Sequence, residues 1–363
     1  MRVLSCLRYL LVACLFLSAA AQAAPSGDDA IVFTRAPSNA DGTPRASGLW
    51  LTSAAGTRAL TPTVDGIFDA AGAWSPHGTL IAFQRGVRER ARTRHDLYSI
   101  ARDGQRLRRL THGPGDFTAP AWNTDGRIAF VAAYDDRACV GVMRADGRDR
   151  RDLFCAAGPT QLASPQWSPD GRSVLVGGGV YVGRLDPVWR ALAWSVDATT
   201  GAARTLVDTT MDEERTLAIS PDGQHGVFAD VVPNQMLLVD FATGTQTPVG
   251  TGYAPAWSHD GRRIAYTGEV YEFSPDLHYY NPLYVMDADG NNARRVTRAR
   301  VSNLAYAAAA WSRDDSHVLA NLRAYADPSL TIARYALRRI GVDDATLVAL
   351  PAGYAGSGAW FQH

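Results

Sequence analysis

A short phrase of sequence recurs through the chain and constrains the fold more than any other feature. It is an apolar anchor, usually Trp, followed by Ser-Pro-Asp-Gly or close equivalents and then by an apolar run; residues 167–171 show it in full. The anchors are Trp74, Trp122, Trp167, Ile219, Trp257 and Trp311, and consecutive anchors are 38 to 54 residues apart. A period of this length is typical of β-propellers, in which each repeat forms one four-stranded blade.

The interior of each repeat predicts four strands. The Pro-Asp-Gly segment is a tight turn, because Pro presets φ and Gly accepts a positive φ. In the repeat that begins at Trp257, residues 263–267 alternate as a second strand, residues 283–286 form a third, and Asp289-Gly290 turns the chain into a fourth. Sustained helical periodicity is absent from the sequence. We therefore expect an all-β fold.

The two ends of the chain set the number of blades. Residues 31–35, 49–51 and 58–61 read as second, third and fourth strands, with no first strand before them. Residues 358–361 read as a first strand with nothing after it. If this C-terminal strand completes the N-terminal blade, the ring has seven blades and its closing sheet has no missing strand. We predict this seven-bladed β-propeller; six blades with an irregular end is the alternative.

The N-terminus predicts export. Arg2 and Arg8 precede an apolar run over residues 9–21, and residues 21–23 give the small-x-small pattern that signal peptidase cleaves. We expect a signal peptide over residues 1–23, cleavage before Ala24, a periplasmic location and a single propeller domain over residues 24–363. The run is shorter than the ~20 residues that span a bilayer, so no membrane span is expected. A lipoprotein cleavage at Cys14 is the alternative.

Two cysteines remain beyond the signal segment, Cys139 and Cys155. An even pair in an exported chain predicts a disulfide. They flank the turn at residues 146–147 at nearly equal distances, as cross-strand neighbours in a hairpin would. Two free buried thiols are the alternative.

Part of the repeat resembles a known family. Residues 257–266, 283–290 and 294–297 are similar to the repeat of the TolB-type propellers. The resemblance implies a periplasmic propeller that acts by binding other macromolecules, here a protein or cell-envelope partner. We expect the chain to lack the N-terminal α/β domain of TolB proper, because its first strand follows soon after the cleavage site.

Several function classes are not supported by the sequence. The chain has 36 basic and 36 acidic residues, so it lacks the positive field of a nucleic-acid binder. Residues 356–358 lack the spacing of a hydrolase nucleophile elbow, the glycine run 177–179 leads into no phosphate loop, and the histidines have no zinc-ligand spacing. We predict no enzyme activity, metal or cofactor.

The anchor tryptophans should pack blade against blade, and the repeated aspartates should bond their own turns. Those aspartates are Asp125, Asp170, Asp222, Asp260 and Asp315.

The candidate binding residues lie in the long connections between second and third strands, which share one face of a propeller. These connections are rich in Arg and aromatic side chains, the types that dominate binding hot spots. The candidates are Arg85, Arg88, Arg90, Arg92, Arg94, Tyr181, Trp189, Tyr271, Phe273, His278 and Tyr279. A solvated Arg loop with aromatics folded against their own blade is the alternative reading.

The alternative function uses the central funnel. It is either a carbohydrate lyase or hydrolase, or a small-ligand sensor. The sequence leaves the oligomeric state open.

Overall fold

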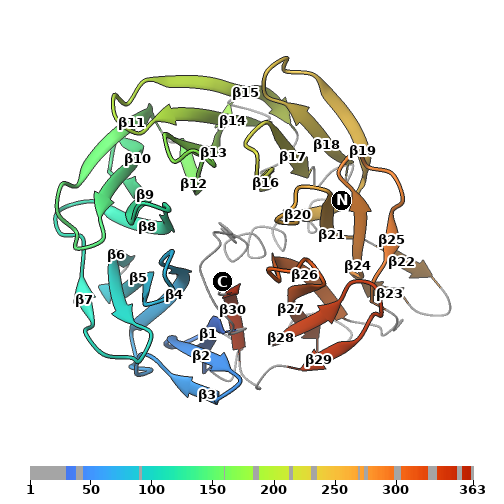
Figure 1. Ribbon diagram of the computed structural model, residues 1–363, viewed down its shortest axis with the longest axis horizontal. Helices are drawn as coiled ribbons and strands as arrows, with labels where there is room; N and C mark the ends of the chain where they lie inside the picture. The colour runs from blue at the N-terminus through green and yellow to red at the C-terminus, as the bar shows by residue number, and fades with distance from the viewer. Residues whose placement is uncertain are drawn as a thin grey trace.

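A computed structural model gives the fold, and its strands form a ring of seven four-stranded antiparallel sheets (Figure 1). It describes residues 30–37, 44–89, 92–158, 160–182, 188–211, 216–229, 235–268, 270–273, 277–297, 304–325, 333–349 and 354–360. The described residues contain strands and turns and no helix, and no helix that could cross a membrane is found among them. The predicted seven-bladed, all-β architecture is confirmed.

Each blade runs from an inner strand near the central axis to an outer strand on the rim (Figure 1). Blade 1 contains β30 (Tyr354–Trp360), β1 (Ile31–Ala36), β2 (Gly48–Ser53) and β3 (Gly56–Ala59). Blade 2 contains β4 (Ile67–Trp74), β5 (Leu80–Glu89), β6 (Arg92–Ala101) and β7 (Arg108–Arg109). Blade 3 contains β8 (Asp116–Trp122), β9 (Arg127–Ala133), β10 (Arg137–Arg144) and β11 (Arg151–Ala157). Blade 4 contains β12 (Gln161–Trp167), β13 (Ser173–Val182), β14 (Val188–Asp197) and β15 (Ala203–Met211).

The other three blades follow the same order. Blade 5 contains β16 (Thr216–Ile219), β17 (His225–Ala229), β18 (Gln235–Asp240) and β19 (Gln246–Thr251). Blade 6 contains β20 (Tyr253–Trp257), β21 (Arg263–Thr267), β24 (Leu283–Asp287) and β25 (Arg294–Arg295), with an added hairpin of β22 (Val270–Phe273) and β23 (Leu277–Tyr280). Blade 7 contains β26 (Leu304–Trp311), β27 (His317–Tyr325), β28 (Ala333–Gly341) and β29 (Leu347–Ala349).

The last strand of the chain closes the ring. β30 pairs antiparallel with β1, with Ile31 opposite Trp360 and Val32 opposite Ala359. The inner strand of the N-terminal blade is thus supplied by the C-terminal end of the chain. Pairing across the two chain ends also covers an edge of β1 that would otherwise be open to other strands. The closure expected from the sequence is confirmed.

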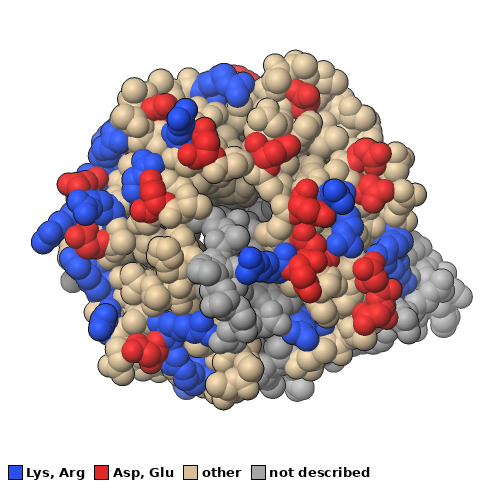
Figure 2. All heavy atoms as spheres, in the orientation of Figure 1, with Lys and Arg blue, Asp and Glu red and all other residues tan. Residues whose placement is uncertain are grey.

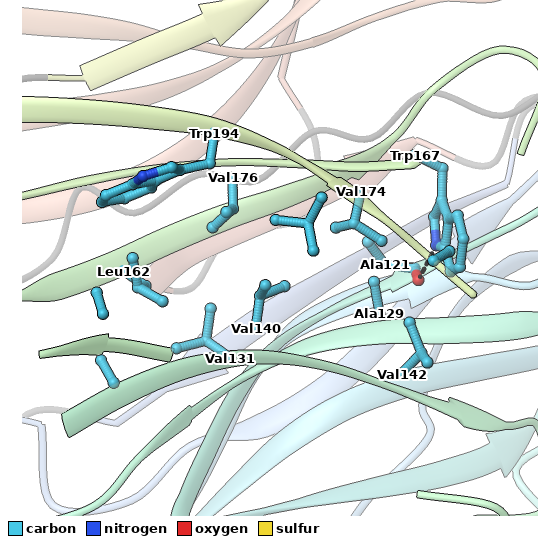
Figure 3. Close-up of a cluster of buried hydrophobic side chains, with 14 of the residues drawn as sticks. Ala121, Ala129, Val131, Val140, Val142, Leu162, Trp167, Val174, Val176 and Trp194 are labelled. Carbon is cyan, nitrogen blue, oxygen red and sulfur yellow. Dashed lines mark hydrogen bonds between the residues drawn. The ribbon is translucent and has the colours of Figure 1, made fainter. Parts of the chain in front are cut away.

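The anchor tryptophans join neighbouring blades, as expected. The indole Nε1 of Trp122 donates a hydrogen bond to the backbone oxygen of Ala73 (3.1 Å), and that of Trp311 donates to Ala256 (2.9 Å). In the cluster between blades 3 and 4, Trp167 donates to Ala121 and packs beside Val142 and Val174 (Figure 3). The acceptor is in each case the residue just before the preceding blade's anchor, so each Trp sets the position of one blade on the next.

Outer-strand arginines form a second set of links between blades, which the sequence analysis did not anticipate. Arg151 on β11 donates to the backbone oxygens of Thr199 (2.8 Å) and Ala198 (2.6 Å) in the turn after β14. Arg204 and Arg294 bond the corresponding turns of the blades that follow theirs, at Phe241 and Val342. Several of the chain's arginines therefore link neighbouring blades and are unavailable for binding a partner.

Most of the repeated aspartates bond their own turns, as expected. Asp170 accepts hydrogen bonds from the Ser168 hydroxyl and the Arg172 backbone N–H, and these bonds lower the pKa of its carboxyl. The expectation is wrong for Asp315, which stands where other copies have Gly. Its φ of 53° lies in the left-handed region, and its carboxylate accepts from the Nδ1 (2.7 Å) and backbone N–H of His259 in the turn of blade 6. In this copy Asp314 bonds the local turn instead.

The glycine run in β13 has a packing reason. A Cβ on Gly178 would lie 2.1 Å from the backbone oxygen of Gln161 on β12, and one on Gly177 would lie 3.0 Å from Leu217 of blade 5. Only Gly allows this strand to lie so close to its neighbours. Gly178 thus allows the close approach of β13 to β12 within blade 4, and Gly177 is part of the blade 4–blade 5 contact.

Candidate functional site

The candidate binding residues that the structure describes map to one end of the blades, which we call the loop face. It carries the connections between second and third strands, namely β5–β6, β13–β14 and the segment of blade 6 that holds β22 and β23. The opposite end carries the Ser-Pro-Asp-Gly turns. Because the strands of a blade are antiparallel, the connections from one blade to the next also lie on the loop face.

Arg85 does not project from the loop face. Its Nε and Nη2 donate to Oδ1 (2.6 Å) and Oδ2 (2.7 Å) of Asp69, its cross-strand partner on β4. The Asp69 side chain is fully buried, and the Arg85 guanidinium also lies over the Tyr98 ring, 4.9 Å from its centroid. The bond to Asp69 raises the pKa of Arg85 although burial opposes this. This two-bond ion pair gives Arg85 a structural role in blade 2.

Arg88 lies at the exposed end of the same strand. Its guanidinium covers the half-buried Phe68 ring at 4.9 Å, and its backbone N–H donates to Gly66 (2.9 Å). Val87 next to it and Val64 in the preceding connection are 41% and 45% exposed, which is high for apolar side chains. Phe68 and Arg88 share one face of the sheet, whereas Val87, the residue before Arg88, points to the other face.

Arg92 lies on the same face of the β5–β6 hairpin as Val87. It is exposed on β6 opposite Glu89, and neither Arg92 nor Arg88 forms an ion pair with any residue the structure describes. We refer to Val64, Phe68, Val87, Arg88 and Arg92, which surround the end of the β5–β6 hairpin on both of its faces, as the blade-2 patch. Arg90 lies outside the described residues.

Arg94 and its neighbour His95 are held by the connection into blade 3. The Nη2 of Arg94 donates to the backbone oxygen of Gly113. The backbone N–H and Nδ1 of His95 lie 2.5 Å and 3.0 Å from the Asp116 carboxylate. Burial raises the pKa of Asp116, but the bonds from His95 and the charge of Arg92 outweigh it and leave the pKa lowered. These contacts fix the base of the β5–β6 hairpin.

The blade 4 candidates lie on a long extension of its sheet. Tyr181 is 43% exposed, and its backbone pairs with that of Trp189 across β13 and β14. The Trp189 side chain lies outside the described part. Sequence reasoning missed the adjacent pair of Arg190 and Asp208, whose guanidinium and carboxylate share two hydrogen bonds of 2.7 Å and 2.6 Å on the surface. Arg190 is opposite Thr210 and Asp208 is opposite Leu192, so the two charges are diagonal neighbours across β14 and β15 and not a directly facing pair.

The blade 6 candidates lie on the added hairpin. In its backbone register Tyr271 is opposite Tyr279, Phe273 is opposite Leu277, and His278 is opposite Glu272. The side chains of these residues lie outside the described part of the chain. The structure therefore brings these four candidates together on one hairpin, well apart along the ring from the blade-2 patch (Figure 1).

Charge is mixed on the face of the ring that Figure 2 shows. Figure 2 shows arginines and acidic side chains interspersed on one face of the ring, with uncharged surface between them. A surface of this kind does not favour a polyanion through its overall field. Selective contact must come from local groups such as those of the blade-2 patch.

One group of possible metal ligands occurs among the described residues. Its members are Cys139, Asp152 and Cys155, with ligand atoms within 4.8 Å of one another. The two cysteines form a disulfide with their Cα atoms 4.0 Å apart, which confirms the predicted pairing. In this oxidised state the sulfur atoms are not available as thiolate ligands.

Comparison with known proteins supports the fold and leaves the activity open. No protein-family model and no curated protein matches the chain. TolB from Acinetobacter baumannii is 16% identical with a TM-score of 0.51, over 92% of this chain and 83% of that one. A puromycin hydrolase is 17% identical with a TM-score of 0.63, over 94% of this chain and 55% of that one, so this chain spans about half of it. An oligogalacturonate lyase in complex with manganese is 14% identical with a TM-score of 0.51, over 66% and 73% of the two chains.

These likenesses establish a TolB-like β-propeller fold. The similar structures include enzymes as well as TolB, and identities of 14–17% carry the fold only. Function must therefore be argued from the groups that this chain presents.

Proposed function

We propose that this chain is a non-catalytic propeller of the periplasm that captures a protein partner through its loop face. The blade-2 patch is the primary contact. Its exposed apolar atoms and its two cations without ion pairs suit a partner segment in which acidic side chains flank an apolar one. A rigid closed ring holds the patch in place, so little ordering is needed on binding.

The observation that carries this proposal is the state of Arg88 and Arg92. Arg85 and Arg94, on the same hairpin, are held by bonds to Asp69 and Gly113, whereas Arg88 and Arg92 are exposed and without a carboxylate partner in the described structure. Arg88 is also set over an aromatic ring, which restricts its motion. Exposed, oriented arginines next to apolar surface are the usual components of a binding hot spot.

The test is capture by purified protein immobilised through a C-terminal tag. Arg88→Glu with Arg92→Glu should abolish capture of the partner from a periplasmic extract while leaving thermal unfolding unchanged. Arg172→Glu is the matched control, because Arg172 is exposed in the Ser-Pro-Asp-Gly turn on the opposite face. Equal capture by the charge-reversed and control proteins would remove the blade-2 patch from the proposal.

A further inference from the structure

The group formed by Cys139, Asp152 and Cys155 arises from an irregularity in blade 3. Cys139 on β10 is directly opposite Cys155 on β11, and Gly141 is opposite Asp152. Only one residue separates Cys139 from Gly141, but two separate Asp152 from Cys155, so β11 bulges at this point. In a regular strand Asp152 and Cys155 would lie on opposite faces. The bulge brings the carboxylate to the same face as both sulfur atoms.

The carboxylate is also held in place. The Tyr134 hydroxyl donates a hydrogen bond to Oδ2 of Asp152 at 2.9 Å, which leaves Oδ1 available. Tyr134 is itself positioned by the Arg137 guanidinium, 4.9 Å from its ring centroid, and by an edge contact with the Phe117 ring. Outer-shell hydrogen bonds of this type orient carboxylate ligands in metal sites.

The two cysteines differ in access. Cys139 is fully buried in the core between blades 2 and 3, whereas Cys155 is exposed on the outermost strand. A reductant in solution can therefore reach the disulfide from the Cys155 side, with the Cys139 sulfur as the leaving group. Because the backbone ladders of β10 with β9 and β11 remain, reduction leaves the two sulfur atoms facing each other.

We propose that these three residues form a redox-controlled zinc site, closed by the disulfide and opened when a thiol or phosphine reductant cleaves it. Two thiolates and one carboxylate are a ligand set that zinc accepts, with water in the fourth position. Ligand atoms of a tetrahedral zinc are roughly 3.5 Å apart, so atoms that already lie within 4.8 Å need only small side-chain adjustments.

Disulfide reduction and zinc binding each conserve atoms and electrons. With a phosphine, the disulfide accepts two electrons, two protons from one water go to the two sulfur atoms, and the water oxygen goes to phosphorus as phosphine oxide. Zinc then binds the two sulfur atoms and one Asp152 oxygen, and the two thiol protons leave to solvent.

The experiment is a zinc chloride titration of the mature chain from Ala24, in which Cys139 and Cys155 are the cysteines that remain, against a chromophoric chelator before and after phosphine reduction. Reduced protein should bind one zinc per chain, and oxidised protein and Cys155→Ser should bind none. Tyr134→Phe should weaken zinc binding by roughly ten-fold, and Asp152→Asn should weaken it further. The control is Asp136→Asn, which should leave the zinc affinity unchanged. Asp136 is a nearby exposed carboxylate that pairs with Arg137.

Zinc should also raise the thermal midpoint of reduced protein and leave that of oxidised protein unchanged. The thermal midpoint tests the proposal even if blade 3 is partly unfolded in reduced, metal-free protein, because zinc binding should then restore the fold. Reduced protein that binds zinc no better than Cys155→Ser, an unaltered affinity in Asp152→Asn, or reduced protein that stays unfolded in excess zinc would each overturn the proposal.

Discussion

The indole nitrogen of Trp167 donates a hydrogen bond to the backbone oxygen of Ala121, 3.0 Å away across the seam between blades 3 and 4. Trp122, Trp257 and Trp311 make the same bond to the blade before each of them. Ile219 occupies this position in blade 5 and has no donor to offer. The repeat that is visible in the sequence is thus a repeat of blade-to-blade contacts, and the anchor of blade 5 cannot form this bond.

Trp167→Phe should lower the free energy of unfolding by about 1–2 kcal/mol, because it removes the seam bond and leaves most of the apolar packing. Trp50→Phe is a suitable control, since the Trp50 Nε1 is buried without a hydrogen-bond partner among the described residues. Urea unfolding measures both. An equal loss in the two variants would mean that the Trp167 bond adds nothing to packing.

Arg151→Lys should lower the free energy of unfolding by about 0.5–1 kcal/mol. A single ammonium cannot reproduce the two bonds that the guanidinium makes to Ala198 and Thr199. Arg172→Lys, at an exposed position in a turn, should have no measurable effect on urea unfolding. If both variants unfold like the parent protein, the outer-strand arginines do not link the blades energetically.

Asp69→Ala should be strongly destabilising, by about 3–5 kcal/mol, because it leaves the Arg85 guanidinium in a mostly buried site without its partner. The double variant Asp69→Ala with Arg85→Met should be more stable than Asp69→Ala alone, since no unpaired charge remains. Thermal unfolding of Asp69→Ala, Arg85→Met and the double variant gives the coupling energy between the two side chains. Additive losses would contradict a coupled pair.

The contact between His259 and Asp315 predicts an acid-sensitive seam between blades 6 and 7. Burial raises the pKa of Asp315, but hydrogen bonds from the His259 ring and from the backbone N–H groups of His259 and Asp260 outweigh it, so the pKa is lowered. A lowered carboxyl pKa adds stability above the unfolded value of about 4, and this is lost as pH falls through the folded-state value.

Asp315→Asn isolates this effect, because Asn also tolerates a positive φ. It should be less stable than the parent at pH 7, and the difference should shrink toward zero below about pH 4, as measured by urea unfolding at each pH. A constant difference between the two pH values would show that the Asp315 charge is not responsible.

The fold was largely predictable because turn chemistry and period are local properties. Trp, Pro, Asp and Gly at fixed offsets encode one blade, and the unmatched strands at the two ends encode the closure through β30. The disulfide followed from its spacing about a hairpin turn. Each of these inferences needed only neighbouring residues or a count of strands.

The binding site was less predictable, because the sequence of an Arg-rich segment does not show which residue each Arg contacts. Arg85 and Arg88 are three residues apart, yet one is held by the buried Asp69 and the other lies on the surface over Phe68. Cross-strand register decides this difference. The grouping of Asp152 with Cys139 and Cys155 depends on a single bulge in β11, which the sequence does not indicate.

Site-specific photocrosslinking in intact cells tests the binding account most directly. A photoreactive residue at position 88 should crosslink to one partner protein, and the same residue at position 172 on the opposite face should not. Crosslinks to the same protein from both positions, or from position 172 alone, would contradict capture through the loop face.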